Sequence, residues 1–340
     1  DYNALGFVAT ESPGENDTAG GVFRVYGTWN LIGQGTKNTG GIVFKVENRH
    51  AYTDIAPTDF ADELGYAGLV NPVFRNQGWR VTHLHWRQVF NDGRGVAYAG
   101  VLDITDYVDA YLLVSPWTSF SNLAFGTGSG TIGALPDGAL GAMVGGFVSD
   151  NVYITGGIVD ANGDPTDPGG AIDSFLDDAE TFKSLEVGWT STPPDPAGYA
   201  INNIHVSLWQ VDERTEAGTP KGWGAAFSAS GIIAKQWLPF VRGGWSKDGG
   251  SWYEASLSAG FGFRPKGSSD VLGVGLNLSR PNESTYGSNL DDQFTTEVFY
   301  ALQLSDKFVV TPSIQYLGNP ALNPDDDNIW LFGLRARAAF

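Results

Sequence analysis

Residues 328–340 read Asn-Ile-Trp-Leu-Phe-Gly-Leu-Arg-Ala-Arg-Ala-Ala-Phe and end the chain. Alternate residues from Trp330 to Phe340 are all apolar, whereas the positions between them include Arg335 and Arg337. A period of two is typical of a β-strand, because successive side chains of a strand point to opposite faces. The strand ends on an aromatic residue, as the closing strands of bacterial outer-membrane barrels commonly do. The stretch therefore predicts that the rest of the chain forms such a barrel.

The composition fits a protein with an aromatic outer surface and a polar interior. The 340 residues include 20 Phe, 13 Tyr and 11 Trp, yet the mean hydropathy is only -0.14. Transmembrane barrels combine these properties because aromatic girdles face the lipid while the lumen is polar. No apolar run reaches the roughly 18–20 residues that a transmembrane helix needs. A membrane-spanning chain of this sequence would therefore have to be a closed barrel.

Charge and cysteine content argue against several other classes of protein. The formal net charge is -18 and the pI is about 4.4, whereas a nucleic-acid-binding protein is expected to carry a basic surface. The absence of cysteine excludes a disulfide framework and a thiolate metal site. The chain starts at Asp1 with neither an initiating Met nor a signal peptide, which indicates a processed or trimmed mature form.

Strand and turn patterns follow one another without a dividing linker, so we expect a single domain over residues 1–340. About sixteen strands are expected, and single-chain bacterial barrels have an even number. The expected ranges are 3–9, 22–30, 42–50, 81–90, 96–102, 140–149, 152–159, 184–190, 204–211, 222–230, 238–245, 253–264, 272–279, 294–304, 308–317 and 328–340. A large soluble β-sandwich would also alternate, but no helical pattern is present that could cover such a sheet. By alternation, Tyr253, Phe261, Trp330 and Phe332 should face lipid or a neighbouring subunit.

The stretch 103–138 breaks the strand pattern. It starts with Asp-Ile-Thr-Asp-Tyr-Val-Asp over residues 103–109, continues through Trp117 and Phe120, and includes a Gly-rich run to Gly138. It does not alternate as a spanning strand would, and it is long for a hairpin loop.

Several stretches resemble the carbohydrate-selective porin family, the OprB-like porins. They include Gly-Ile-Val-Phe-Lys-Val-Glu-Asn-Arg-His at 41–50, Leu-Asp-Ile-Thr-Asp-Tyr-Val-Asp-Ala-Tyr at 102–111, Leu-Glu-Val-Gly-Trp at 185–189, Trp-Leu-Pro-Phe-Val-Arg-Gly-Gly-Trp at 237–245, Thr-Glu-Val-Phe-Tyr at 296–300 and Pro-Ala-Leu-Asn-Pro at 320–324. The resemblance covers nearly the whole chain. The Trp-Gly-Gly-like motif that such porins usually carry in an amino-terminal segment has no counterpart here.

The resemblance implies an all-β transmembrane barrel of sixteen antiparallel strands in the bacterial outer membrane, through which sugars diffuse. It also implies that a segment at about 103–138 folds into the lumen as a constriction loop. The usual porin arrangement is a homotrimer. The expected partners are sugar substrates, the lipid bilayer and lipopolysaccharide, with no cofactor and no metal.

The candidate channel-lining residues are charged or aromatic. They are Arg24, Lys45, Glu47, Arg49, Arg87, Asp103, Asp106, Asp109 and Trp117. The first five lie on the lumen face of early strands, and the three aspartates belong to the 103–138 stretch. Charged groups exchange hydrogen bonds with sugar hydroxyls, and aromatic faces pack on sugar rings. A mostly basic wall opposite an acidic loop would set up a transverse field across the pore.

Structural interpretations of the same residues stay open. The charges could be ordinary salt bridges that hold the loop to the wall, and Trp117 and Phe120 could anchor the loop by packing. Further residues face the lumen by alternation, where we expect simple lining of a water channel. These are Glu186, His205, Glu254, Glu297, Arg335 and Arg337.

Passive diffusion of mono- or oligosaccharides is the favoured function, and a general pore for ions or small organic acids is the main alternative. An outer-membrane enzyme or adhesion surface is less favoured, since there is no Gly-x-Ser-x-Gly elbow. His83 and His85 share a strand face but have no third metal ligand nearby in sequence. Residues 160–164 match the start of a calcium loop, but Pro165 and Ala171 replace its glycine and glutamate, so we interpret them as a turn.

Overall fold

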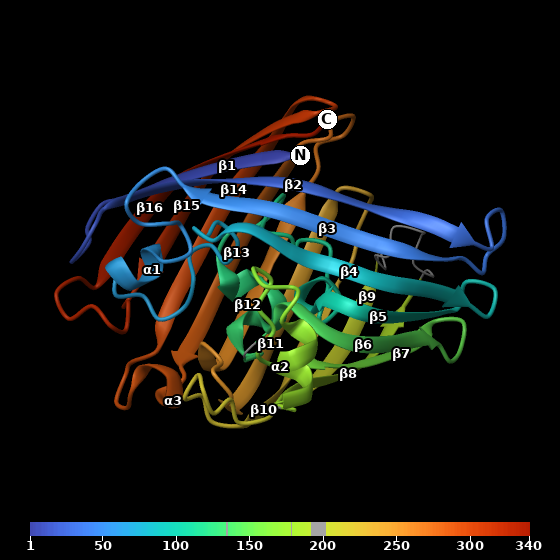
Figure 1. Cartoon of the computed structure of the whole chain (residues 1–340). Coiled ribbons are helices and arrows are strands. Elements are labelled where there is room, and N and C mark those ends of the chain that lie inside the picture. Colours follow the sequence, from blue (N-terminus) through green and yellow to red (C-terminus); the bar gives the residue numbers. More distant parts are fainter. Residues whose placement is uncertain (134, 178, 192–201) are drawn as a thin grey trace.

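The computed structural model describes residues 1–133, 135–177, 179–191 and 202–340, apart from the side chains of Asp173 and Asp177. Within these residues sixteen strands form a closed antiparallel barrel, in which each strand pairs with its neighbours in sequence and β1 pairs with β16 (Figure 1). The strands are β1 (Tyr2–Ala9), β2 (Asp17–Ile32), β3 (Gly40–Ala51), β4 (Gly78–Phe90), β5 (Gly95–Asp103), β6 (Asp137–Phe147), β7 (Val152–Asp160), β8 (Thr181–Thr190), β9 (Asn203–Val211), β10 (Gly222–Ser230), β11 (Trp237–Asp248), β12 (Tyr253–Phe263), β13 (Val271–Pro281), β14 (Gln293–Ser305), β15 (Phe308–Gly318) and β16 (Asn328–Ala338). The barrel prediction is confirmed.

In the part of the chain that the structure describes, helical structure is confined to short pieces between strands. The α-helices are α1 (Phe60–Glu63), α2 (Ala171–Asp177) and α3 (Glu283–Tyr286), and the 3-10 helices are η1 (Ile104–Asp106), η2 (Leu123–Phe125) and η3 (Thr127–Gly130). No helix among the described residues is long and apolar enough to cross a membrane.

The closing strand has the two faces that its sequence predicts. Trp330, Phe332 and Leu334 are 46%, 52% and 57% exposed on the outer face. The intervening Ile329 and Leu331 are fully buried inside. Strand β16 pairs with β15 along its whole length and with β1 over eight residue pairs, from Tyr2–Ala338 to Ala9–Leu331. Closure leaves no free sheet edge, as a membrane-spanning sheet requires.

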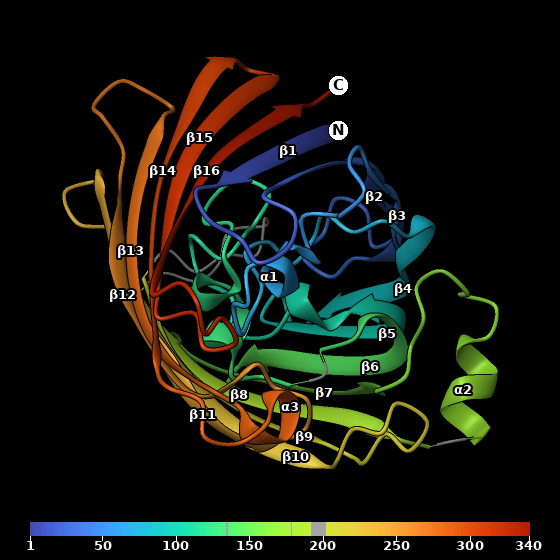
Figure 2. The same cartoon turned by 90° about the vertical axis from the view of Figure 1, so that its left-hand side faces the viewer.

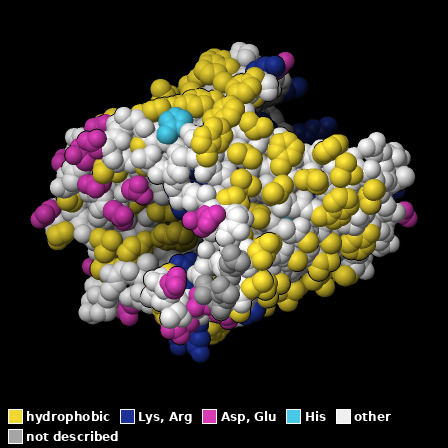
Figure 3. All heavy atoms as spheres, in the orientation of Figure 1, with side chains coloured by type: hydrophobic (Ala, Val, Ile, Leu, Met, Phe, Trp, Pro, Cys, Tyr) yellow, Lys and Arg dark blue, Asp and Glu magenta, His cyan; other side chains and the backbone are white. Residues whose placement is uncertain are grey.

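Apolar side chains are exposed around the outside of the barrel, as in transmembrane barrels. They include Val8, Trp29, Leu84, Trp86, Val144, Ile154, Leu185, Val206, Leu208, Trp223, Trp245, Leu257, Leu276, Val298 and Ile314. Figure 3 shows hydrophobic side chains spread over the strands on one face of the barrel, whereas acidic side chains gather near the end of the barrel that carries α1.

The prediction that Tyr253 faces outward is wrong. Tyr253 is fully buried inside the barrel, where its hydroxyl lies 2.7 Å from the hydroxyl of Tyr66. The cause is a β-bulge: Tyr253 pairs with Pro281 but Ala255 pairs with Arg280, so Glu254 is an extra residue in β12. An extra residue reverses the alternation before it. Beyond the bulge the prediction holds, and Phe261 packs against the exposed Trp237 on the outer face.

Two segments fold inside the barrel, as Figure 2 shows. We call them the first inner segment (residues 52–77, between β3 and β4) and the second inner segment (residues 104–133 and 135–136, between β5 and β6). The first was not predicted; it carries α1 and packs Phe60, Leu64, Tyr66, Val70 and Phe74 against Leu5, Val22, Leu317, Ile329 and Leu331 of the wall. The second packs Tyr111, Leu113, Phe120 and Phe125 against Leu238, Phe240, Phe299 and Ala301. Much of the inner wall is therefore covered by protein.

Candidate functional site

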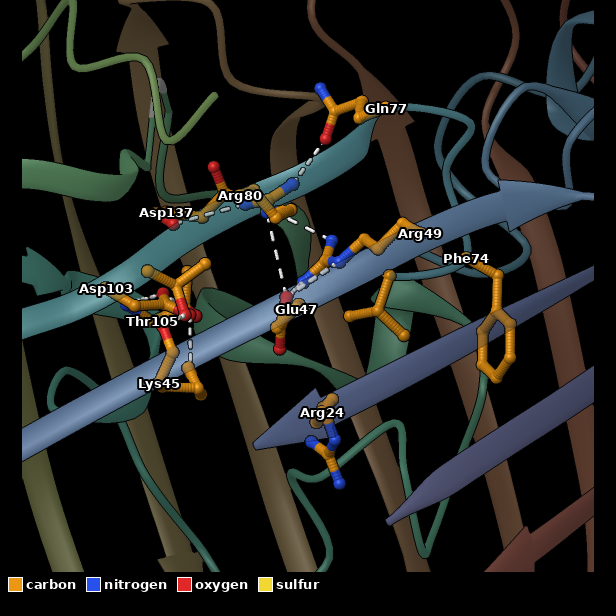
Figure 4. Close-up of polar contacts among 12 residues, drawn as sticks. Arg24, Lys45, Glu47, Arg49, Phe74, Gln77, Arg80, Asp103, Thr105 and Asp137 are labelled. Atoms are coloured by element: carbon orange, nitrogen blue, oxygen red, sulfur yellow. Dashed lines mark hydrogen bonds and ion pairs between the residues drawn. The ribbon is translucent and has the colours of Figure 1, made fainter. Parts of the chain in front are cut away.

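Basic side chains form a row across three neighbouring strands inside the barrel. Arg24 lies on β2, Lys45 and Arg49 lie on β3, and Arg80 lies on β4 (Figure 4). The pairing of Arg24 with Glu47, and of Glu47 with Arg80, brings these strands into register at one level. We call Arg24, Lys45, Arg49 and Arg80 the basic row.

The sequence analysis did not predict that Arg80 faces inward, because β4, like β12, contains a β-bulge. Lys45 pairs with His83 but Val46 pairs with Val81, which leaves Thr82 as the extra residue. Arg80 and His83 therefore both face inward although they are three residues apart. The signal in the sequence that could have found Arg80 is the preceding Trp79, since an outward-facing tryptophan places its neighbour Arg80 on the inner face; Trp79 is indeed exposed.

Carboxylates neutralise part of the basic row. Glu47 Oε2 accepts from Arg49 Nε at 2.9 Å and lies 3.6 Å from Arg80 Nε. Arg80 Nη2 donates to Asp137 Oδ2 at 2.5 Å, and Arg49 Nη1 lies 3.9 Å from the same oxygen. A further guanidinium, that of Arg75 from the first inner segment, is close enough for its charge to interact with both arginines and with Asp137. Arg49 and Arg80 thus share Glu47 and Asp137, and Arg75 interacts with Asp137 and with Asp59.

Lys45 joins the wall to the beginning of the second inner segment. Its ammonium donates to Asp103 Oδ2 at 3.0 Å and to Asp106 Oδ2 at 2.7 Å. Asp106 Oδ2 also lies 2.9 Å from His83 Nε2. The side chain of Asp103 is 7% exposed and caps η1 by accepting from the backbone N–H of Thr105, whereas the side chain of Asp106 is 47% exposed. Three predicted residues, Lys45, Asp103 and Asp106, therefore meet at one place.

Asp109 lies apart from this group and is fully buried. Its carboxylate accepts from Arg242 of β11 and from the backbone N–H of Gly128 at 2.5 Å, and it lies 2.8 Å from His205 Nε2 of β9. The backbone N–H of Asp109 donates to Glu186 Oε2 of β8 at 2.9 Å. Burial alone would raise the pKa of Asp109, but the charge of Arg242 and the hydrogen bond with His205 outweigh it and lower the pKa. Asp109 thus anchors the second inner segment to the wall.

Arg242 was not among the predicted site residues, although its strand carries a usable signal. It alternates with Trp237, Val241 and Trp245, which are exposed on the outer face. A strand with such an outer face places Arg242 inside. Its guanidinium also covers the Tyr111 ring, with 3.8 Å between the guanidinium carbon and the ring centre.

Four residues expected to line water instead hold the second inner segment. Besides Glu186 and His205, Glu297 accepts from the backbone N–H groups of Ser121 and Asn122 at 2.7 and 2.8 Å. Arg335 donates to the carbonyls of Pro116 and Ser119 at 2.6 and 2.9 Å. Two further residues, Arg337 and Glu254, were also expected to line water. Arg337 pairs with Asp1 at 2.9 Å, and Glu254 is the extra residue at the β-bulge of β12. Water lining is therefore the wrong description for Glu186, His205, Glu297 and Arg335, which are buried.

The two candidate aromatic residues differ in their surroundings. Phe120 is buried, with its ring centre 4.7 Å from that of Phe125 and 4.9 Å from that of Phe299, so it packs the segment in place. Trp117 is only partly buried and lies beside the basic row: the guanidinium carbon of Arg24 is 3.9 Å from its ring centre, and that of Arg49 is 5.7 Å away.

Arg87 is not part of the basic row. It lies further along β4, paired with Tyr98 of β5, and its side chain is partly exposed. The nearby His83 and His85 have hydrogen-bond partners, and no group of three or more potential metal ligands occurs among the described residues.

Comparison with known proteins decides the family. The model of the OprB family, described as carbohydrate-selective porin, matches residues 20–340. The chain belongs to the OprB family. The match spans all sixteen strands except β1 and the start of β2. No curated protein sequence matches the chain.

Solved porin structures share the fold of this OprB-family chain. The high-pH structure of Pseudomonas putida OprB has a TM-score of 0.75 at 15% identity and covers 100% of this chain and 93% of that chain. The low-pH structure of the same protein has a TM-score of 0.54 at 12% identity, with 100% and 91% covered. A multiple mutant of the Rh. blastica porin has a TM-score of 0.59 at 13% identity, with 100% and 98% covered. The family and the fold both indicate a channel rather than an enzyme.

Proposed function

We propose that this chain is a water-filled channel for passive diffusion of mono- or oligosaccharides across a bacterial outer membrane. The observation that carries the proposal, within the family match, is the buried basic row with its carboxylate partners Asp103, Asp106 and Asp137, of which Asp106 is half exposed. Ammonium, guanidinium and carboxylate groups can replace the water around sugar hydroxyls through charge-assisted hydrogen bonds. The partly exposed Trp117 beside them supplies an apolar surface for a sugar ring.

The two inner segments are proposed to narrow this channel. They form apolar clusters with side chains of β1, of the first part of β2, of β6–β11 and of β14–β16, so water would be left chiefly along the rest of β2–β5. A narrow path favours neutral sugars over ions. An ion loses much of its hydration in such a path, and the charged side chains that could replace this hydration are already paired with one another. Diffusion down a gradient needs neither a cofactor nor energy coupling.

The apolar outer surface of the barrel indicates that lipid surrounds it. The exposed apolar side chains between the two ends fit a lipid bilayer. Residence in the outer membrane, with lipopolysaccharide as a neighbour, and assembly as a homotrimer are proposals that rest on the family and not on a contact in the structure.

A pore for small anions, including organic acids, is the second candidate. The observation that favours it is the cluster of three guanidinium groups, those of Arg49, Arg75 and Arg80, around the carboxylate of Asp137. Such an excess would attract anions into the pore.

Single-channel conductance in a planar bilayer tests the proposal. Glucose and glucose oligosaccharides should block the ion current of the wild-type channel in a concentration-dependent way. Trp117→Leu should weaken this block about three- to tenfold, since aromatic contacts contribute about 0.5–1.5 kcal/mol. The control is Arg94→Gln in the β4–β5 turn, which removes an exposed ion pair with Asp150 and a hydrogen bond to the carbonyl of Ser149.

Other outcomes point elsewhere. A current that no sugar alters, but that organic acids block, would favour the anion pore. If the folded protein inserts into the bilayer but conducts no current, the result would favour an outer-membrane enzyme or an adhesion surface over a channel.

A further inference from the structure

We propose that Tyr98, Tyr107, Asp106 and Arg87 form a second saccharide-binding subsite on the inner wall at β4 and β5, separate from Trp117. The inference rests on the proposed function. The ligand class is a pyranose sugar with neighbouring hydroxyl groups. Tyr98 lies on β5, Arg87 lies on β4, and the other two residues come from the start of the second inner segment.

The apolar part of the subsite is a cluster of four rings. The ring centres of Tyr98 and Tyr107 are 4.7 Å apart, and His85 lies 5.6 Å from the first and 6.1 Å from the second. His83 lies 5.6 Å from Tyr107 and 5.1 Å from His85. The two histidines are buried, whereas the two tyrosines are partly exposed. The tyrosines therefore form the accessible side of a packed aromatic surface.

This aromatic surface is held in place before any ligand arrives. The Tyr107 hydroxyl lies 3.3 Å from His85 Nε2, and His85 Nδ1 lies 3.1 Å from the carbonyl oxygen of Val101. His83 Nδ1 accepts from the backbone N–H of Asp103 at 3.2 Å. A preorganised aromatic surface loses little conformational entropy on binding. The C–H face of a pyranose packs favourably on such rings.

A hydrogen-bond acceptor lies at one side of the rings. Asp106 Oδ2 is occupied by Lys45 and His83, but Asp106 Oδ1 has no hydrogen-bond partner in the part of the chain that the structure describes. The side chain of Asp106 is 47% exposed. Asp103, three residues earlier, is the contrasting case: both of its oxygens are used, and it is 7% exposed. A purely structural carboxylate would resemble Asp103, whereas Asp106 has a free, exposed acceptor.

A hydrogen-bond donor lies at the other side. Arg87 is partly exposed, it pairs with Tyr98 across the two strands, and its charge acts on the hydroxyls of both tyrosines. Acceptor, apolar surface and donor thus follow one another along the wall. This order matches a pyranose, whose ring face is apolar and whose edge carries hydroxyls that both donate and accept.

The test compares sugar block of the ion current in bilayers for the wild-type channel and four variants. Tyr98→Leu, Tyr107→Leu and Asp106→Asn should each weaken the affinity for glucose oligosaccharides about three- to tenfold. Tyr107→Phe keeps the ring and should stay within about twofold of wild type. The matched control is Tyr300→Leu, which changes a tyrosine of β14 whose hydroxyl contacts only Asp270.

Two readouts separate a binding role from a structural one. At Tyr98 and Tyr107, a binding role changes sugar affinity while the sugar-free conductance and the thermal stability of the barrel stay at wild-type values, and a structural role changes all three. Asp106→Asn also removes a counter-charge of Lys45, so for this variant only the sugar affinity is compared. If the Tyr107→Leu variant does not fold, the sugar affinities of the Tyr98→Leu and Asp106→Asn variants test the subsite. Wild-type affinity in these variants would overturn the subsite and leave the proposed function standing. Absence of sugar block in the wild-type channel would overturn both.

Discussion

The three aspartates of the 103–109 motif show how surroundings assign different roles to one residue type. Asp103 is buried and caps a helical turn, Asp106 is half exposed beside Lys45, and Asp109 is fully buried against Arg242. Their spacing in sequence is regular, but η1 turns Asp106 toward water, and Asp109 adopts a left-handed backbone with φ of 54°. Of the three aspartates, Asp109 is the one that holds the segment from a fully buried position.

At this scale we expect Asp109→Asn to lower the free energy of unfolding by about 3–5 kcal/mol. The substitution leaves the buried guanidinium of Arg242 without its counter-charge. Urea unfolding of protein folded into liposomes, followed by Trp fluorescence, measures the change. The control Asp150→Asn should have no measurable effect, because the carboxylate of Asp150 is 94% exposed.

The same variant has a defined pH dependence. Because the pKa of Asp109 is lowered in the folded protein, its contribution is complete above the unfolded value of about 3.9. The contribution is lost as the pH falls below that value toward the folded pKa. The stability difference between wild type and Asp109→Asn should therefore shrink below about pH 4. A difference that grows on acidification would contradict the assignment.

At the scale of elements, two β-bulges and two inner segments shape the interior. The bulges at Thr82 and Glu254 redirect Arg80 and Tyr253 inward. Tyr253 then meets Tyr66 of the first inner segment. The bulge in β12 thus supplies a contact that a regular strand would have placed in lipid.

We expect Gln293→Ala to loosen the first inner segment. Gln293 of β14 holds Ala67 at both backbone groups: its Oε1 accepts from the N–H at 3.0 Å and its Nε2 donates to the carbonyl at 2.8 Å. Ala67 is fully buried, so each group left unpaired costs about 1–3 kcal/mol. Limited proteolysis within residues 52–77 should become faster, and single-channel conductance should rise.

The control for this variant lies on the same strand. Gln303→Ala changes a residue whose side chain, among the described residues, bonds only to Ser305 at the β14–β15 turn. It should leave both proteolysis and conductance unchanged. Equal protease resistance of Gln293→Ala and wild type would show that Gln293 does not hold the segment.

At the scale of the whole molecule, the inner wall is divided into a covered and a charged part. Ser258 of β12 is fully buried and donates to the carbonyl of Ala124 at 2.6 Å, beneath the second inner segment. Tyr26 of β2, next to the basic row, is 51% exposed. The division places the proposed water path on one side of the barrel.

The absence of cysteine allows this division to be tested with single substitutions. Tyr26→Cys should react quickly with a charged thiol reagent in membranes, whereas Ser258→Cys should be protected by the segment above it. Leu276→Cys, on the outer face, should be protected by lipid. Rapid labelling of Ser258→Cys would contradict the proposed path.

The sequence by itself determined the barrel, the number of strands, most outward faces and the inward position of Arg24, Lys45 and Arg49. These features depend on a period of two and on turns, which are local properties of the chain. Local periodicity fails where a bulge adds a residue, as the burial of Tyr253 shows.

Only the tertiary structure decided what fills the barrel and which charges pair. Asp109 meets Arg242 across 133 positions of sequence, and Glu297 meets Ser121 across 176. Such pairings depend on the closed barrel bringing opposite walls to the same segment, and no short-range pattern encodes them. For that reason the first inner segment and the anchoring roles of Glu186, His205, Glu297 and Arg335 became visible only in the folded protein.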